Sequence, residues 1–443
     1  MPKIGDFHPL LPWPIGMADQ DPRPSRSRRP KLARAGYLLF LLAFTFLCVE
    51  LGARWYLVHA LGKSTTKKFR FNSYRVYEHV PGFREGDGER EWIAINGQGF
   101  RHKNEVAIDK PDDTYRIFLM GGSAAHGISS NAPYPVVHIG MDETIDAQLA
   151  SLLQQAHPDD HIEVVNAAVT GYNVFQHTAY LLSELLEYDP DLVIFFDGAN
   201  DHYTSDPAFR YLPDFKYQFW SPRLKQPSLA GQFDYTAHYL AEYSAFFRAY
   251  ISWKMNRDAF QNNLRMSMDA GHASAADRIA AHRAAAPKQF LRSVEMNLFL
   301  LHREGIDAVL CLQPMLALRD PANRSKEEHS FPKLREDTNV RVLYPVILEE
   351  LEEAAQRWNV PLIDMNVPFN HAGWKGKQLL IDYCHLTPLG GRVAAEALLP
   401  VVDPLRIMRS KRPIGGTPSH VPVRDGGLLL DSSMIKAPPR SGT

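Results

Sequence analysis

From Tyr115 onward, short apolar segments alternate with longer segments whose apolar residues recur every three or four positions. Short apolar runs predict buried strands, and the longer periodic segments predict amphipathic helices. The expected strands are Arg116–Met120, Ile162–Asn166, Leu192–Phe196, Asp307–Leu312 and Pro361–Met365. The expected helices lie near Glu143–Ala156, Gln176–Glu187, Pro287–Arg303 and Leu343–Trp358, with a last helix after Thr387-Pro388. This alternation predicts an α/β fold with a doubly wound, mostly parallel five-stranded sheet and helices on both faces.

Reactive or hydrogen-bonding groups follow the first three expected strands. The first strand leads into Gly-Gly-Ser123, the second is followed by Gly171, and the third leads into Gly-Ala-Asn200-Asp. Ligands of such sheets sit beyond the carboxyl ends of the strands, so these turns are expected at one rim. Near the C-terminus, Asp382 and His385 are three residues apart, a spacing that places both side chains on one face of a turn.

These residue types suit nucleophilic catalysis. A serine hydroxyl needs a base, a group that orients the base, and donors for the developing oxyanion. Asp382 can hold the imidazole of His385 in one tautomer while the other ring nitrogen faces Ser123. The amide of Asn200 can donate two hydrogen bonds, and the bare backbone of Gly171 can approach a ligand closely.

In this order, the four blocks resemble those of the SGNH (GDSL-type) hydrolases, and the likeness spans roughly residues 92 to 400. The resemblance implies an SGNH-type three-layer sandwich in which Ser123 attacks an ester, His385 is the base and Asp382 orients it. It also implies an oxyanion hole made by the backbone N–H groups of Ser123 and Gly171 and by the side chain of Asn200. Gly122 stands where the family usually has aspartate, so any role of that acid in setting the turn is open. The segment 95–101 resembles the lead-in of membrane-anchored bacterial members.

Each block also has a simpler interpretation when taken alone, as a turn, a helix cap or a loop. His126 is interpreted as a loop histidine at the pocket rim rather than as a second base. Cys311 and Cys384 are interpreted as packing residues, and the charged stretch from Arg319 to Asn339 as a solvated loop.

Composition narrows the function classes. The 443 residues are 45% hydrophobic and 22% charged with a net charge of −1, so no global basic field favours nucleic acid as a partner. Three cysteines are too few for a disulfide framework. The sequence has no paired Cys-x-x-Cys spacing and no phosphate-binding loop, so no metal and no cofactor are predicted.

The N-terminus predicts a membrane anchor. Residues 1–34 form an arm rich in arginine and proline, and residues 35–60 are the expected transmembrane helix. Its uncharged run ends at Val49, short of the roughly 20 residues that a span needs. The segment is long enough for a span if it continues past Val49, with Glu50 and Arg54 paired near the membrane interface and the aromatic residues after them lying at that interface. The basic arm predicts a cytoplasmic N-terminus and a periplasmic or extracellular catalytic domain. A cleaved signal peptide, a lipoprotein and a buried amphipathic helix are the alternatives.

The expected organisation continues with a lead-in segment at 61–114, the hydrolase domain at 115–400 and a poorly ordered tail at 401–443. An insertion at about 203–286 carries an aromatic stripe at helical spacing, made of Tyr239, Tyr243, Phe246, Phe247, Tyr250 and Trp253. This stripe either packs on the core or forms a lid or acceptor-binding wall.

The sequence thus favours a membrane-anchored serine esterase that transfers an acyl group from an ester to water or to another alcohol. The expected substrate is an ester, such as an acylated glycan or lipid. One alternative is an O-acetyltransferase of envelope polysaccharide that uses the same residues with a sugar hydroxyl as acceptor. Another is a catalytically silent anchored binding module.

Overall fold

The computed structural model describes residues 29–59, 68–86, 89–128, 137–201, 290–331 and 336–410, with parts of 236–254 and 274–280. The central sheet has five parallel strands in the order β6-β5-β7-β8-β9. They span Thr114–Gly121 (β5), His161–Asn166 (β6), Leu192–Asp197 (β7), Asp307–Leu312 (β8) and Leu362–Asp364 (β9). All five expected strands are present, within two residues at each end.

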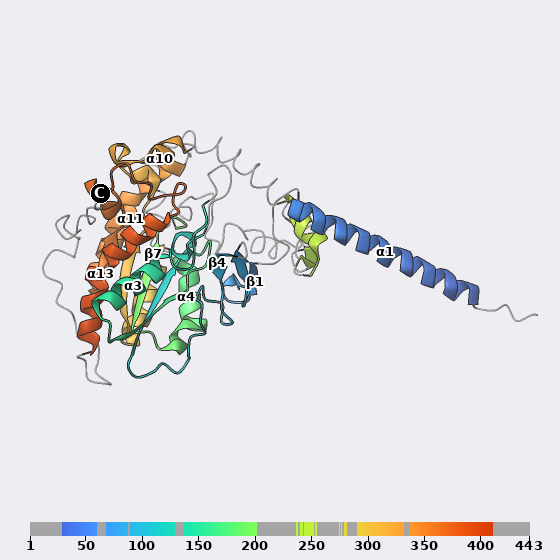
Figure 1. Ribbon diagram of the computed structural model, residues 1–443, viewed down its shortest axis with the longest axis horizontal. Coiled ribbons are helices and arrows are strands. Elements are labelled where there is room, and N and C mark those ends of the chain that lie inside the picture. The colour runs from blue at the N-terminus through green and yellow to red at the C-terminus, as the bar shows by residue number, and fades with distance from the viewer. Residues whose placement is uncertain are drawn as a thin grey trace, which may run out of the picture.

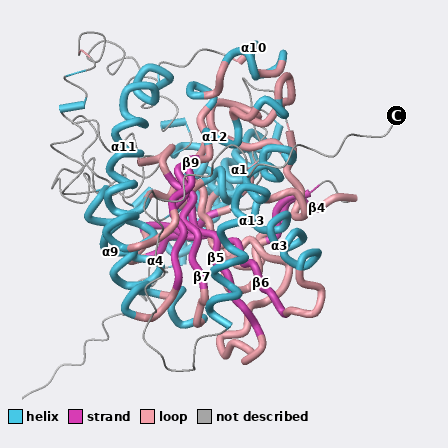
Figure 2. Tube along the Cα trace, turned by 90° about the vertical axis from the view of Figure 1, so that its left-hand side faces the viewer, coloured by secondary structure: helices cyan, strands magenta, loops and turns pink. Residues whose placement is uncertain are grey.

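Successive residues of each strand point to opposite faces of the sheet, and each face has its own core. Phe118, Val193 and Leu310 belong to one hydrophobic cluster, whereas Ile117, Ile194 and Val309 belong to the other. Helices cover both faces, so the predicted doubly wound, three-layer α/β architecture is confirmed (Figure 2).

The longer helices form two groups, one on each face of the sheet (Figure 2). The first group is α4 (Val174–Ser183), α9 (Phe290–Arg303) and α11 (Glu336–Trp358). The second group is α3 (Ile145–Ala156) and α13 (Pro388–Ser410), which pack against each other. The shorter helices are α2 (Ser123–His126), α10 (Lys326–Ser330) and α12 (Asn366–Phe369).

The C-terminal boundary at residue 400 is corrected. The helix α13 continues to Ser410, ten residues into the expected tail, because Val401, Val402 and Leu405 are buried in the second core. This apolar face outweighs Pro400 and Pro404, which lie inside the helix. Residues 411–443 lie outside the described part of the chain.

The lead-in segment forms two antiparallel hairpins, β1 (Phe69–Asn72) with β2 (Val76–His79) and β3 (Arg84–Gly86) with β4 (Glu91–Ala94). Tyr77 connects the first hairpin to the sheet domain, since its hydroxyl donates to the carbonyl of Thr170 at 2.7 Å. Its backbone carbonyl in turn accepts a hydrogen bond from the hydroxyl of Tyr172.

The N-terminal helix α1 (Arg29–His59) extends away from the sheet domain (Figure 1). Within it, Ala33–Tyr56 is long and apolar enough to cross a membrane. Most of the insertion at 203–286 lies outside the described residues, but part of 236–254 lies beside the domain-facing end of α1 in Figure 1.

Candidate active site

Ser123 follows β5 directly and opens the short helix α2. The chain turns at Gly122, whose carbonyl accepts the N–H of His126, and the Ser123 carbonyl accepts the N–H of Gly127 at 3.0 Å. Gly127 closes the turn with a φ of +77°, a left-handed conformation that glycine adopts without strain. This strand–turn–helix arrangement presents a half-buried Ser123 at the carboxyl end of the sheet.

The structure brings Ser123 together with the pair at the C-terminal end of the domain. The hydroxyl of Ser123 lies 2.7 Å from Nε2 of His385, and Nδ1 of His385 lies 2.6 Å from Oδ2 of Asp382. The three side chains thus form a continuous hydrogen-bonded relay between residues 262 positions apart.

Backbone hydrogen bonds fix the carboxylate of Asp382. Its Oδ1 accepts the N–H groups of Cys384 at 2.9 Å and His385 at 2.8 Å. Burial disfavours the charged form of Asp382, but the adjacent imidazole and these hydrogen bonds lower its pKa below the ordinary value. An ionised Asp382 accepts the Nδ1 proton of His385, which leaves the lone pair of Nε2 facing the serine.

Asn200 lies at the same rim and is held by the segment that carries Gly171. Its Nδ2 donates to the carbonyl of Tyr172 at 2.7 Å, which uses one of the two amide protons and leaves the other for a ligand. Gly171, next to Tyr172, has a φ of +87° and therefore favours glycine.

The close approach of Asn200 explains the glycine at position 122. A Cβ added to Gly122 would lie 2.4 Å from Nδ2 of Asn200, so any larger residue there would push this amide out of its present position. The glycine that departs from the usual motif thus allows the amide to lie directly against the serine turn. No local pattern could indicate this role of Gly122, because the contact joins two turns 78 residues apart.

A buried acidic cluster that sequence reasoning missed lies behind Asn200. Asp201 accepts the N–H of Val174 at 3.1 Å, and Asp197 lies 2.9 Å from Nε2 of His177. Burial, together with the charge of Asp197, raises the pKa of Asp201 to about 7. The Asp201 carboxyl fastens the turn that carries Asn200 to the start of α4.

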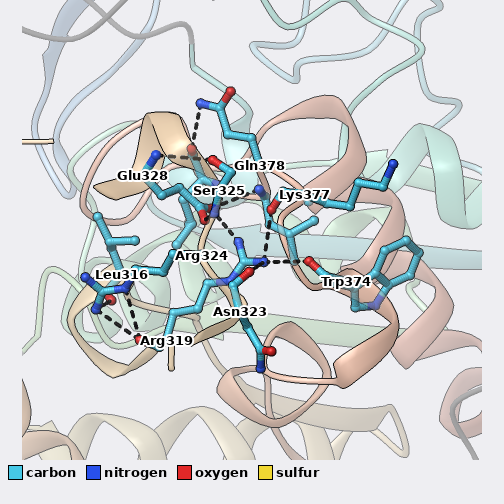
Figure 3. A network of polar contacts seen from close by, with 12 residues as sticks. Leu316, Arg319, Asn323, Arg324, Ser325, Glu328, Trp374, Lys377 and Gln378 are labelled. Atoms are coloured by element: carbon cyan, nitrogen blue, oxygen red, sulfur yellow. Dashed lines mark hydrogen bonds and ion pairs between the residues drawn. The ribbon is translucent and has the colours of Figure 1, made fainter. Parts of the chain in front are cut away.

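A second network, around Arg319 and Glu328 (Figure 3), holds the segment Trp374–Leu380 that leads into the loop with Asp382 and His385. Arg319 and Glu328 form a buried ion pair, and Glu328 also accepts the N–H groups of Leu379 and Leu380 at 3.0 Å. Arg319 donates to the carbonyls of Asn323, Trp374 and Lys377 at 3.0–3.1 Å. The described part of the stretch 319–339 is therefore not only a solvated loop. Arg319 and Glu328 pair within this stretch, but the backbone groups of Trp374, Lys377, Leu379 and Leu380 that they also hold lie 51–58 residues further along the chain, beyond the reach of a local pattern.

His126 is not at the pocket rim, and that interpretation was wrong. Its side chain is buried beneath α2, with its ring centroid 4.6 Å from that of His79. Neither of its ring nitrogens has a hydrogen-bond partner among the residues that the structure describes. Burial lowers the pKa of His126 well below the ordinary value, so the ring is neutral at physiological pH.

Cys311 and Cys384 are both buried, as expected for packing residues. Burial also raises the pKa of the Cys384 thiol, so it stays protonated at neutral pH. Within the described part of the chain, the side chains close enough together to ligate a metal are those of Asp382, Cys384 and His385. Both ring nitrogens of His385 are already engaged, by Asp382 and by Ser123.

No family model and no curated protein sequence matches the chain. Among solved structures, an α/β hydrolase from the metagenome of Lake Arreo is 13% identical, covering 66% of this chain and 96% of its own, with a TM-score of 0.37. An acetylxylan esterase from Geobacillus stearothermophilus is 14% identical, covering 65% and 94%, with a TM-score of 0.35. A GDSL-like lipase from Parabacteroides merdae is 12% identical, covering 67% and 98%, with a TM-score of 0.36. These likenesses are loose, and the parallel sheet with its four converging blocks is what agrees with the SGNH resemblance.

Proposed function

We propose that the protein is a serine hydrolase of the SGNH type that cleaves, or transfers the acyl group of, a carboxylic ester. The relay of Asp382, His385 and Ser123, with hydrogen bonds of 2.6 and 2.7 Å, is the observation that carries this proposal. Such distances are those expected of an activated nucleophile and its base.

In the proposed first step, Nε2 of His385 takes the hydroxyl proton of Ser123 as Oγ bonds to the ester carbonyl carbon. The carbonyl oxygen becomes an oxyanion, which the second amide proton of Asn200 and the backbone N–H groups of Ser123 and Gly171 stabilise. The protonated His385 then gives its proton to the leaving alcohol as the carbon–oxygen bond breaks. Asp382 stabilises the imidazolium throughout and keeps its own charge.

The acyl-enzyme is released by the same steps in reverse. A water molecule or another alcohol gives a proton to His385 and attacks the acyl carbon, and Ser123 leaves with the proton returned. Asn200 meets the requirement for a preorganised donor, because its amide is already fixed by Tyr172 before any substrate binds.

The protein is further proposed to be anchored in a membrane by α1, with the residues before Ala33 on the cytoplasmic side and the domain at 115–410 outside. The support is the 24-residue apolar stretch Ala33–Tyr56, whose side chains are almost all exposed in the isolated chain. The arginine-rich residues before it favour an N-terminus that stays inside.

Hydrolysis of p-nitrophenyl acetate by the purified full-length protein tests the chemistry. Ser123→Ala is expected to abolish turnover above background, and Asn200→Ala to lower kcat by about 10²–10³-fold. Ser151→Ala, an exposed serine on α3, is the matched control and should keep full activity. The proposal fails if Ser123→Ala retains the parent rate.

Labelling with a fluorophosphonate probe separates an enzyme from a silent binding module. The probe reacts only with an activated serine, so the parent and Ser151→Ala should be labelled and Ser123→Ala should not. A parent that takes up no label while remaining folded would favour the binding module.

A further inference from the structure

Glu50 is an unusual residue of α1. From Ala33 to Tyr56 the side chains of this helix are exposed, except that Ala53 is half-buried and Glu50 is buried. Glu50 lies six residues before the end of the apolar stretch, about 9 Å along the helix axis. A span placed on Ala33–Tyr56 would therefore hold a carboxylate inside its domain-facing end, where an unpaired charge is costly.

The partners of Glu50 come from the insertion almost two hundred residues away. Its carboxylate accepts the hydroxyl of Ser244 at 2.7 Å and the N–H groups of Ala245 at 2.7 Å and Phe246 at 3.2 Å. Arg54, one turn further along α1, donates to the same carboxylate at 3.2 Å. Figure 1 shows this part of the insertion beside the end of α1 and apart from the central sheet.

Contact with Glu50 fixes the depth of the insertion relative to α1. Residues 244–246 must lie at the level of Glu50, which is inside the apolar stretch and not beyond it. Where α1 crosses a bilayer, this part of the insertion therefore reaches the boundary between the lipid headgroups and the acyl chains.

The side chains of this segment suit that boundary. Tyr243, Phe246 and Trp253 are 69%, 40% and 54% exposed, so the aromatic stripe is not packed on the core at these positions. On α1, Trp55 and Tyr56 are also exposed, at 64% and 45%. Tryptophan and tyrosine concentrate at membrane–water interfaces, where an apolar ring with a polar edge fits the headgroup level.

We propose that residues 243–251, 253 and 254 form a second membrane-contact element, an interfacial segment that lies on lipid and is clasped to α1 through Glu50. This proposal rests on the proposed anchoring by α1 and assigns the exposed aromatic residues to lipid rather than to a lid over Ser123. Two attachments in place of one helix would restrict the tilt of the hydrolase domain relative to the bilayer.

Spin labels in the full-length protein, reconstituted in phosphatidylethanolamine–phosphatidylglycerol vesicles, test the proposal. Cys48→Ser removes the exposed native thiol, and single cysteines then replace Phe246 or Trp253. Leu51→Cys reports on α1 itself. Phe299→Cys, on α9 and 46% exposed against 40% for Phe246, is the matched control on the hydrolase domain.

Collisions of each label with oxygen, which concentrates in lipid, are compared with those of a water-soluble nickel chelate. Oxygen collisions are expected to prevail at positions 51, 246 and 253, and nickel collisions at 299. The inference is overturned if position 51 reports lipid while 246 and 253 report water, a result that leaves the anchor intact. A water-like signal at position 51 would instead overturn the anchoring and this inference with it.

Glu50→Ala tests the clasp separately. With the carboxylate removed, the ratio of oxygen to nickel collisions at position 246 should fall towards that at 299, while position 51 is unchanged. Retained ester hydrolysis shows that the variant is folded, because Glu50 is no part of the site around Ser123. An unchanged ratio at 246 would overturn the role of Glu50.

Discussion

Arg101 and Arg319 are both buried, and each supports one half of the candidate active site in a different way. Arg319 is paired with the carboxylate of Glu328, so the loop of Asp382 and His385 is supported by a charge-neutral group. Arg101 lies under the serine turn and is hydrogen-bonded to the carbonyls of Trp92, His126, Gly127 and Ile139.

The two arginines differ in the charges that lie around them. Next to Arg101 are the imidazoles of His79 and His126, and a second positive charge there would meet an unpaired buried cation. Burial lowers the pKa of His79 to about 3 and that of His126 well below its ordinary value, with Arg101 contributing in both cases. We therefore expect acid to lower the stability of the part of the site around Ser123. The stability of the loop with Asp382 and His385 should depend mainly on the ion pair of Arg319 and Glu328.

The largest effect is expected where the ion pair is broken. Glu328→Gln leaves Arg319 buried without a counter-charge and replaces one of the two oxygens that accept the N–H groups of Ser325, Leu379 and Leu380 with an NH2 donor, which should cost about 3–5 kcal/mol. Urea unfolding followed by tryptophan fluorescence measures the loss. Glu327→Gln, the exposed neighbour on α10, is the control and should change little. A loss below about 1 kcal/mol for Glu328→Gln would contradict the comparison.

Removing Arg101 should have the next largest effect. Arg101→Met leaves four carbonyls without their donor, those of His126 and Ile139 buried and those of Trp92 and Gly127 partly buried, and should cost about 2–4 kcal/mol. Because two of these carbonyls belong to the end of α2, esterase activity should fall as well. Lys103→Met, an exposed cation two residues away, is the matched control in both assays. Equal stability of the two variants would show that the carbonyls do not depend on Arg101.

The pH dependence of stability should separate the two halves. A histidine with a lowered pKa in the folded state is protonated first in the unfolded state, so stability is lost as pH falls below about 6.5. Each such imidazole contributes a slope of up to about 1.4 kcal/mol per pH unit. Replacing His126 with Phe should reduce this slope between pH 6.5 and 5, whereas His329→Phe, exposed on α10, should leave it unchanged. A slope unaffected by His126→Phe would disprove the acid sensitivity.

The smallest effect is expected for an ion pair at the surface. Arg392 and Glu396 on α13 are 2.8 Å apart, but their side chains are 36% and 39% exposed. Arg392→Ala should therefore change stability by about 0.5 kcal/mol or less. A high salt concentration should not change the much larger loss of stability caused by Glu328→Gln, because that ion pair is buried. A loss for Arg392→Ala comparable to that for Glu328→Gln would show that burial is not what distinguishes the two pairs.

Much of the fold could be predicted because local patterns specify it. The five apolar runs became the five strands, since helices cover both faces of the sheet and bury most of the residues in them. The expected tail at 401–443 starts too early, because packing of Val401, Val402 and Leu405 against the second core continues α13 to Ser410.

The sequence by itself determined which residues are present at the carboxyl ends of the strands: Ser123, Gly171 and Asn200, with Asp382 and His385 in a later turn. Strand order and loop length place such turns at one rim of a parallel sheet. The residue types in the turns, and their order along the chain, therefore indicate which groups meet there. Only the tertiary structure decided that Gly122 makes room for Asn200, that Glu328 neutralises Arg319, and that Glu50 lies against residues 244–246. These contacts join segments far apart in the chain. Their strength depends on burial and distance, and neither can be read from the spacing of residues along the sequence.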